Sequence, residues 1–119
     1  IGLEITKNFG LHITTDKGRL PEKSGGAETA IALSLITSLH QNAAVKGPLI
    51  MDGPLQQMDK EFTRNVVKFL PDMSDQVIIL AFEKDIDMDS VKEILHDKLS
   101  KQYKIDKINS YQSEIIPYD

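Results

Sequence analysis

Two aspartates stand seven residues apart in the stretch GPLIMDGPLQQMD, residues 47–59. Asp52 directly follows an apolar run, and Asp59 comes after a Gly-Pro turn. A carboxylate at the end of an apolar strand is costly unless a cation or hydrogen-bond donors compensate its charge. Mg²⁺ beside a phosphate is a common partner for such a group. Asp52 is therefore a candidate magnesium ligand, and the alternative is an aspartate that only caps the turn.

A pair of glycines opens a long apolar segment earlier in the chain. Ser24, Gly25 and Gly26 lie in the stretch KSGGAE, residues 23–28. Backbone N–H groups at the start of a helix bind anions, and the absence of side chains at two glycines lets an anion approach closely. The stretch is a candidate phosphate site. Its simpler interpretation is a helix cap and a loop.

Hydrophobic periodicity predicts the elements that must position these residues. Residues 2–15 alternate like a β-hairpin, with Gly10 at its turn free to take positive φ, and the last 17 residues alternate weakly enough to form a second hairpin. We expect a well-buried helix at 24–42 and two strands, at 47–52 and 76–82, that are buried on both faces. We also expect a helix at 59–71, with Asp59 as its cap and Pro71 as its stop, and an amphipathic helix at 89–102.

Buried strands that alternate with helices predict an α/β fold with a mostly parallel sheet and right-handed crossovers. In such sheets ligands bind beyond the carboxyl ends of the strands. Asp52 ends one of the two strands, and Glu83 follows the other. No linker divides the 119 residues, so we expect a single unit.

Composition limits the classes of function. Hydrophobic residues make up 40% and charged residues 27%, which is enough apolar material for a core. The net charge of -4 does not favour nucleic acid over the whole molecule, so any DNA contact needs a local basic patch. The chain has no cysteine, which excludes disulfides, thiolate zinc sites and cysteine nucleophiles. No apolar run is long enough to span a bilayer, so we expect no membrane partner.

The order and spacing of the motifs resemble the ABC-type ATPase heads of the SMC, RecF and RecN group, above all the DNA sulfur modification D subunit and related phage-defence proteins. KSGGAETAIALSL is similar to the signature motif, PLIMDGP to the Walker B strand, LQQMD to the D-loop, and QVIILAF to the strand before the switch-histidine loop. The resemblance covers roughly residues 1–85.

The resemblance implies a role for each matching residue. Ser24, Gly25 and Gly26 would contact the γ-phosphate of ATP held by an opposite head, and Asp52 would hold Mg²⁺. Asp59 would be the D-loop acid at the interface between heads, with Gln56 and Gln57 in the same loop.

Three positions depart from the family pattern. Gly53 stands where the family usually has the glutamate that polarises the attacking water, and glycine cannot act as a general base. Phe82 stands at the switch-histidine position, followed by Glu83 as a possible substitute acid. Ala27 stands at the acid position of the signature motif, with Glu28 one residue late. These departures point to slow hydrolysis, a base from elsewhere, or a site that only binds.

No G-x-x-x-x-G-K-[ST] P-loop occurs in the chain. The family carries its Walker A motif in an N-terminal lobe that a long coiled coil separates from the C-terminal lobe. The resemblance therefore implies that residues 1–119 are a C-terminal lobe, with the Walker A lobe and the coiled coil outside these residues; the absence of an initiator Met agrees.

The expected function is thus a cytoplasmic SMC-like head that dimerises around ATP and Mg²⁺ to clamp or sense DNA, in DNA repair or antiviral defence, with a possible nuclease or effector subunit. One alternative is a degenerate head that acts structurally with little hydrolysis. Another is an α/β interaction module without nucleotide. The lysines after residue 90 could contact DNA phosphates, although a solvated helix face, with Asp and Glu between the lysines, is the simpler interpretation and the one we favour. His12, His40 and His96 have no spacing that predicts a metal site.

Overall fold

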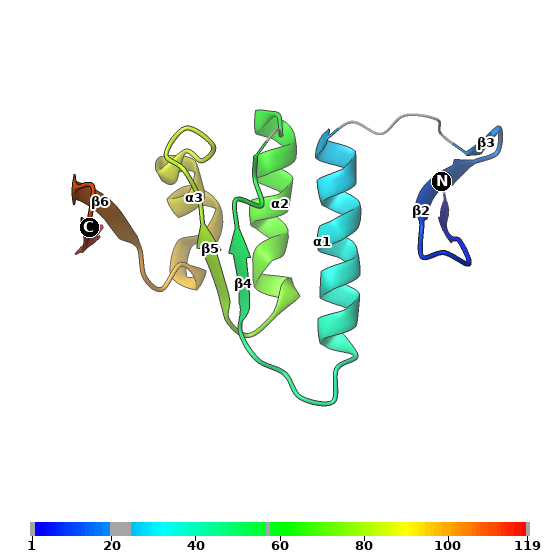
Figure 1. Ribbon diagram of the computed structural model, residues 1–119, viewed down its shortest axis with the longest axis horizontal. Coiled ribbons are helices and arrows are strands. Elements are labelled where there is room, and N and C mark those ends of the chain that lie inside the picture. The colour runs from blue at the N-terminus through cyan, green and yellow to red at the C-terminus, as the bar shows by residue number, and fades with distance from the viewer. Residues whose placement is uncertain (1, 20–24, 57, 119) are drawn as a thin grey trace.

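A computed structural model describes residues 2–19, 25–56 and 58–118. Three helices and three small sheets follow one another along the chain (Figure 1). In chain order the elements are β1 (Gly2–Ile5), β2 (Leu11–Thr15), β3 (Gly18–Arg19), α1 (Gly25–Gln41), β4 (Leu49–Asp52), α2 (Lys60–Met73), β5 (Val77–Leu80), α3 (Met88–Leu95), the short 3-10 helix η1 (His96–Lys98), β6 (Tyr103–Asn109) and β7 (Gln112–Pro117).

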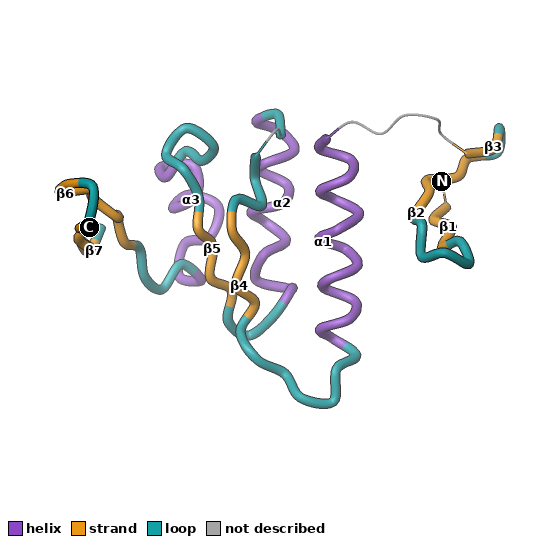
Figure 2. The backbone as a smooth tube through the Cα atoms, viewed as in Figure 1, coloured by secondary structure: helices purple, strands orange, loops and turns teal. Residues whose placement is uncertain are grey.

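The sheets are of two kinds (Figure 2). Strands β4 and β5 form a parallel pair, in register from Leu49 opposite Val77 to Asp52 opposite Leu80. Strands β1, β2 and β3 form an antiparallel sheet, and β6 and β7 form an antiparallel hairpin. The α/β class and both terminal hairpins are confirmed. Parallel pairing within the described residues is limited to β4 and β5.

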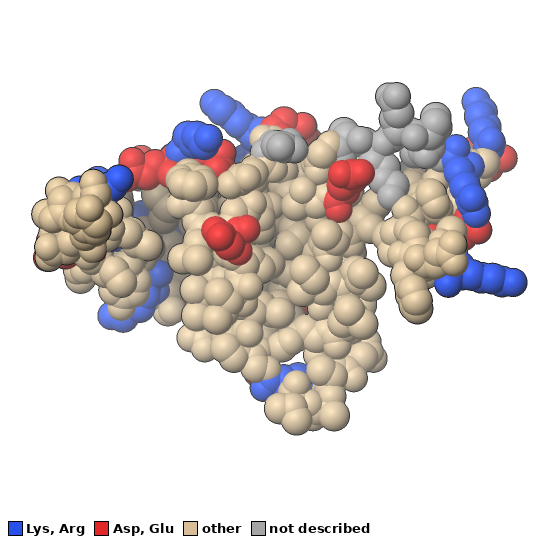
Figure 3. Space-filling view, in the orientation of Figure 1, with Lys and Arg blue, Asp and Glu red and all other residues tan. Residues whose placement is uncertain are grey.

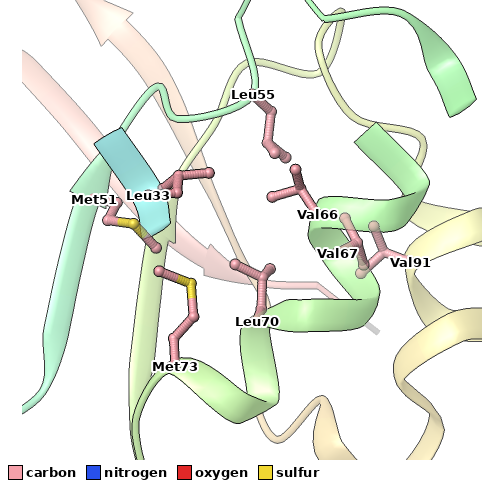
Figure 4. Packing of buried hydrophobic residues seen from close by; sticks show 8 residues of the cluster. All are labelled: Leu33, Met51, Leu55, Val66, Val67, Leu70, Met73 and Val91. Atoms are coloured by element: carbon pink, nitrogen blue, oxygen red, sulfur yellow. The ribbon is translucent and has the colours of Figure 1, made fainter. Parts of the chain in front are cut away.

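The core lies between the parallel pair and the helices (Figure 4). Its least exposed members are Val67 and Met73 of α2, each 1% exposed, and Leu55 of the turn after β4, 2% exposed. Helix α2 supplies half of the cluster because its apolar residues recur at helical spacing. The full cluster is Leu33, Met51, Leu55, Val66, Val67, Leu70, Met73 and Val91.

Strands β4 and β5 bury one face only, so the prediction that both faces are buried is wrong for the described residues. Met51 points into the core, whereas its neighbour Ile50 is 65% exposed. On β5, Ile78 and Leu80 are also exposed and alternate with Val77 and Ile79, which pack on the core. We call Ile50, Ile78 and Leu80 the open face. The physical reason is that α2 and α3 cover one side of the pair and no described element covers the other.

Helix α1 is less buried than its apolar composition predicts. Leu33 and Thr37, one turn apart, are its buried residues, and the Thr37 hydroxyl donates to the carbonyl oxygen of Leu33 at 2.7 Å. Leu35, Ile36 and Leu39 remain exposed. A wide surface over α1, β4 and β5 carries few charged residues in Figure 3. The apolar residues of α1 and of the open face thus exceed what the described residues can bury.

Two local predictions also need correction. Helix α2 continues two residues past Pro71, because the proline removes one hydrogen bond in the last turn while burial of Met73 holds that turn on the core. In the first hairpin Phe9, not Gly10, takes the positive φ, of 60°. Gly10 is instead packed closely: a Cβ there would lie 2.9 Å from the Thr6 hydroxyl, which accepts the Gly10 N–H.

Candidate functional site

The carboxyl ends of β4 and β5 and the N-terminal ends of α1 and α2 lie at the same edge of the molecule, the upper edge in Figure 1. The helices run antiparallel to the strands, as a crossover between parallel strands requires. Asp52, Asp59, Gly25 and Gly26 therefore share one edge. Ser24 and Gln57 lie outside the described residues.

Asp52 is the last residue of β4 and its side chain is exposed. A backbone hydrogen bond holds the chain directly after it, because the Gly53 N–H donates to the Leu80 carbonyl oxygen at 2.8 Å. Among the described residues the Asp52 carboxylate has no hydrogen-bond or ion-pair partner. The fold thus fixes the backbone at this acid and leaves its side chain exposed.

Asp52 fits a magnesium site in which a nucleotide supplies some of the ligands better than a site built from protein side chains alone. The described residues contain no group of three or more histidines, cysteines or acids that could hold a metal. Mg²⁺ keeps several waters and is commonly bound through one or two carboxylates together with substrate phosphates. One accessible carboxylate at a strand end therefore meets the protein's share of such a site, provided that a nucleotide supplies the phosphates.

The turn after Asp52 has an unusual backbone. Gly53 takes φ of 59°, a left-handed conformation that L side chains rarely adopt. The Gln56 side chain folds back over this glycine: a Cβ on Gly53 would lie 2.7 Å from the Gln56 Nε2 atom and 3.1 Å from its Cδ. The backbone therefore disfavours a glutamate at position 53, and an amide already occupies the space of its side chain.

Asp59 is the N-cap of α2, as predicted. Its Oδ1 accepts the Phe62 N–H at 2.7 Å, and its carbonyl oxygen accepts the Thr63 hydroxyl at 2.9 Å. A capping aspartate satisfies a helix N–H that would otherwise lack a partner and places negative charge at the positive end of the helix dipole. The carboxylate stays exposed, so capping leaves room for a second contact.

The glycines begin α1 directly. Gly25 is the first residue of the helix, and its carbonyl oxygen accepts the Thr29 hydroxyl at 2.9 Å. A Cβ on Gly26 would meet nothing within 4 Å. Packing within the described residues therefore gives no reason for glycine at position 26, although glycine costs helix stability relative to alanine.

Glu83, in the loop after β5, contacts a lysine of the C-terminal hairpin. Glu83 lies 3.7 Å from the Lys104 ammonium of β6, and its side chain is 77% exposed. The Lys84 ammonium lies 5.6 Å from the centre of the Phe82 ring, which is itself exposed. Glu83 is therefore engaged with the C-terminal hairpin, and this geometry gives no support to its use as a substitute base.

Two features of this edge were not predicted from the sequence. The first is the position of the Gln56 amide, which depends on the backbone conformation of Gly53. In the sequence the two residues are only three positions apart, and nothing else predicts their contact. The second is Asp85, whose Oδ2 is buried without a hydrogen-bond partner among the described residues. Nearby, Asp87 caps α3 and accepts the Ser90 hydroxyl at 2.6 Å, which holds the pKa of Asp87 below its ordinary value.

The other candidates are dispersed. His12 lies in β2, His40 in the last turn of α1, and His96 after α3, with no shared element. Lys104 pairs with Glu83, and the Lys92 ammonium lies 5.6 Å from the centre of the Tyr118 ring. Within the part of the chain that is described, no helix is both long and apolar enough to cross a bilayer.

No protein-family model matches this chain, and no curated protein matches it significantly.

Proposed function

We propose that this chain is the C-terminal lobe of an SMC-like ABC-type ATPase head, which binds ATP and Mg²⁺ between two heads. The observation that carries the proposal is Asp52, an accessible carboxylate without a described protein partner at the carboxyl end of a parallel strand. Parallel α/β folds bind ligands at this end of the sheet. The resemblance of residues 47–59 to a Walker B strand and D-loop supplies the identity of the ligand.

The glycine at position 26 gives independent support. Glycine in a helix is less favourable than alanine by roughly 0.5–1 kcal/mol. The described residues leave open space where a Cβ would lie. The cost is explained if a group from outside the chain must approach the helix start closely, as the γ-phosphate on an opposite head would.

The open face supports the proposal that these residues are one lobe of a larger head. Parallel sheets occur almost only with both faces covered, and two strands make an unusually small sheet. Ile50, Ile78 and Leu80 are exposed although they are strongly hydrophobic. A Walker A lobe that adds strands and covers this face would bury them and would supply the P-loop that residues 1–119 lack.

In this proposal each residue of the site has a defined task. Asp52 binds Mg²⁺, which neutralises charge on the phosphates of ATP when it is bound. Ser24, Gly25 and Gly26 hold the γ-phosphate of the nucleotide carried by the second head, so ATP joins the two heads. Asp59 keeps α2 capped and presents its remaining carboxylate oxygen to the interface. Because ATP contacts both heads only when they are together, its binding favours the closed dimer.

The test is ATP binding and turnover by the full-length protein with Mg²⁺. Asp52→Asn should lower turnover by about 100-fold or more, the order expected for a positioned electrostatic group at a transferring phosphoryl. Asp75→Asn is the matched control, because Asp75 is also exposed but precedes β5 at the other end of the sheet. Equal turnover in wild type and Asp52→Asn would refute the catalytic proposal.

A degenerate head is the second candidate. Gly53 and Phe82 favour it, because neither can do the chemistry of the glutamate and histidine that the resemblance leads us to expect. In that case ATP binds and joins the heads but is hydrolysed no faster with Asp52 than without it. A DNA-clamping or antiviral-defence role, in the cytoplasm and with an effector subunit, belongs to either version. Absence of any ATP binding would instead favour the interaction module.

A further inference from the structure

The Gln56 amide occupies the place of a missing side chain. A Cβ on Gly53 would lie within 2.7–3.6 Å of three Gln56 side-chain atoms, so the amide lies where a residue-53 side chain would begin. Position 53 directly follows Asp52, at the carboxyl end of β4. A group placed there therefore lies one residue along the backbone from the proposed magnesium ligand.

The position of the amide is not explained by a hydrogen bond. The Gln56 backbone N–H donates weakly to the Gly53 carbonyl oxygen at 3.4 Å, which closes the turn. The side-chain amide has no hydrogen-bond partner among the described residues, and the residue is exposed. Its oxygen and both N–H groups are therefore available to a ligand or a water molecule.

We infer that the Gln56 carboxamide orients the water that attacks the γ-phosphate, in place of the glutamate that position 53 lacks. This inference rests on the proposed ATPase function. A carboxamide accepts a hydrogen bond from water through its oxygen and donates one to a phosphate oxygen through its nitrogen. Glutamine has this water-orienting task in several GTPases.

The reaction needs no proton acceptor on the protein. The water oxygen bonds to the γ-phosphorus as the bond from that phosphorus to the bridging oxygen breaks, and the bond's electron pair stays on the β-phosphate of ADP. The water proton passes to an oxygen of the phosphate that forms. Gln56 holds the water in line but takes no proton, so turnover is slower than with a general base.

The first test compares Gln56→Ala with wild type in the full-length protein with Mg²⁺ and ATP. We expect kcat to fall roughly 10- to 100-fold, because misplacing a reactant by about 1 Å costs that order. Gln76→Ala is the matched control: the same residue type, exposed, at the opposite end of the β4–β5 pair. It should leave kcat unchanged.

The second test measures binding rather than turnover. Gln56→Ala should keep the wild-type affinity for a non-hydrolysable ATP analogue and lose roughly tenfold or more for ADP with aluminium fluoride, which mimics the transferring phosphoryl group with its water in place. An equal loss for both ligands would indicate a merely structural role and would overturn the inference.

The outcomes separate this inference from the function beneath it. If turnover depends on Asp52 but is unchanged in Gln56→Ala, the role of Gln56 is overturned and the proposed ATPase function is not. Binding of ATP without Asp52-dependent turnover also overturns it and leaves the degenerate head. No binding of ATP by the wild type overturns both.

Discussion

Gly53 donates its backbone N–H to the Leu80 carbonyl oxygen across 2.8 Å, one residue beyond the last paired position of β4. This hydrogen bond ties the turn after Asp52 to the end of the neighbouring strand. Asp52 is thereby held between two backbone contacts of the same parallel ladder, while its side chain stays in solvent. An acid so fixed can meet a ligand without first losing backbone freedom.

Gly26→Ala should change stability and association in opposite directions. The substitution removes the conformational cost of a helical glycine and meets no described atom, so we expect the 119-residue chain to gain about 0.5–1 kcal/mol in free energy of unfolding. In the full-length protein the added methyl group should weaken ATP-driven pairing of heads. Denaturant unfolding and analytical ultracentrifugation with ATP measure the two effects; stronger pairing would contradict the proposal.

Ser24→Arg is the corresponding test of the residue before the glycines. An arginine at this position should block close approach of the opposite head's nucleotide and abolish ATP-driven association. The lobe should remain folded, which circular dichroism would verify. Association at the wild-type level with ATP and Mg²⁺ would count against a signature-motif role.

Leu55→Ala should destabilise the fold strongly although Leu55 lies in a turn. Its side chain is 2% exposed and packs in the core cluster, so truncation leaves a cavity and should cost about 2–5 kcal/mol. Leu55→Met, which nearly conserves volume, should cost less than about 1.5 kcal/mol. Chemical denaturation measures both, and similar losses for the two variants would mean that the cavity is not the cause.

If residues 1–119 are one lobe of a larger head, as proposed, substitutions on the open face should cost more in the larger protein than in the 119-residue chain. Ile50→Ala removes an exposed side chain, so its cost in the short chain should be within about 0.5 kcal/mol. If a second lobe covers the face, the cost in the full-length protein should rise to about 2 kcal/mol or more. Met51→Ala, on the buried face of the same strand, should be costly in both. An unchanged small cost for Ile50→Ala would argue against a covering lobe.

The N-terminal sheet should lose stability in acid. The Arg19 guanidinium donates two hydrogen bonds of 2.7 Å to the Glu4 carboxylate, and this pairing lowers the pKa of Glu4. A lowered folded-state pKa gives stability that is present above the unfolded pKa and is lost as pH falls through the folded value. Arg19→Ala should raise the pKa of Glu4 toward its ordinary value, as NMR titration would detect. Because the pair is exposed, only a small gain in stability is expected.

Local signals in the sequence predicted much of the fold. Asp59 followed by an apolar helical pattern correctly marked the start of α2, and the apolar runs before Asp52 and Phe82 correctly marked two strands. These features depend on residues close together in sequence. Burial of both strand faces was predicted wrongly for the described residues: the apolar run Leu49–Met51 predicts that Ile50 is buried, but no described element lies over its face of the strand.

The candidate site was predictable as a set of backbone positions. Asp52 was expected at the carboxyl end of a strand and the two glycines at the start of a helix, and the structure has both there. The left-handed conformation of Gly53 and the resulting position of Gln56 were not predictable, since they depend on how one turn closes against β5. The pairing of Glu83 with Lys104 depends likewise on where the C-terminal hairpin lies.

The conformation of Gly53 also limits how this site can change by mutation. A single codon change could introduce glutamate at position 53, yet the new side chain would meet the Gln56 amide in a backbone conformation that it disfavours. A working base there would need a second change at Gln56 and a rearranged turn. If the proposed ATPase activity is correct, a glutamate at position 53 alone would therefore not restore the general base, and the two positions would have to change together.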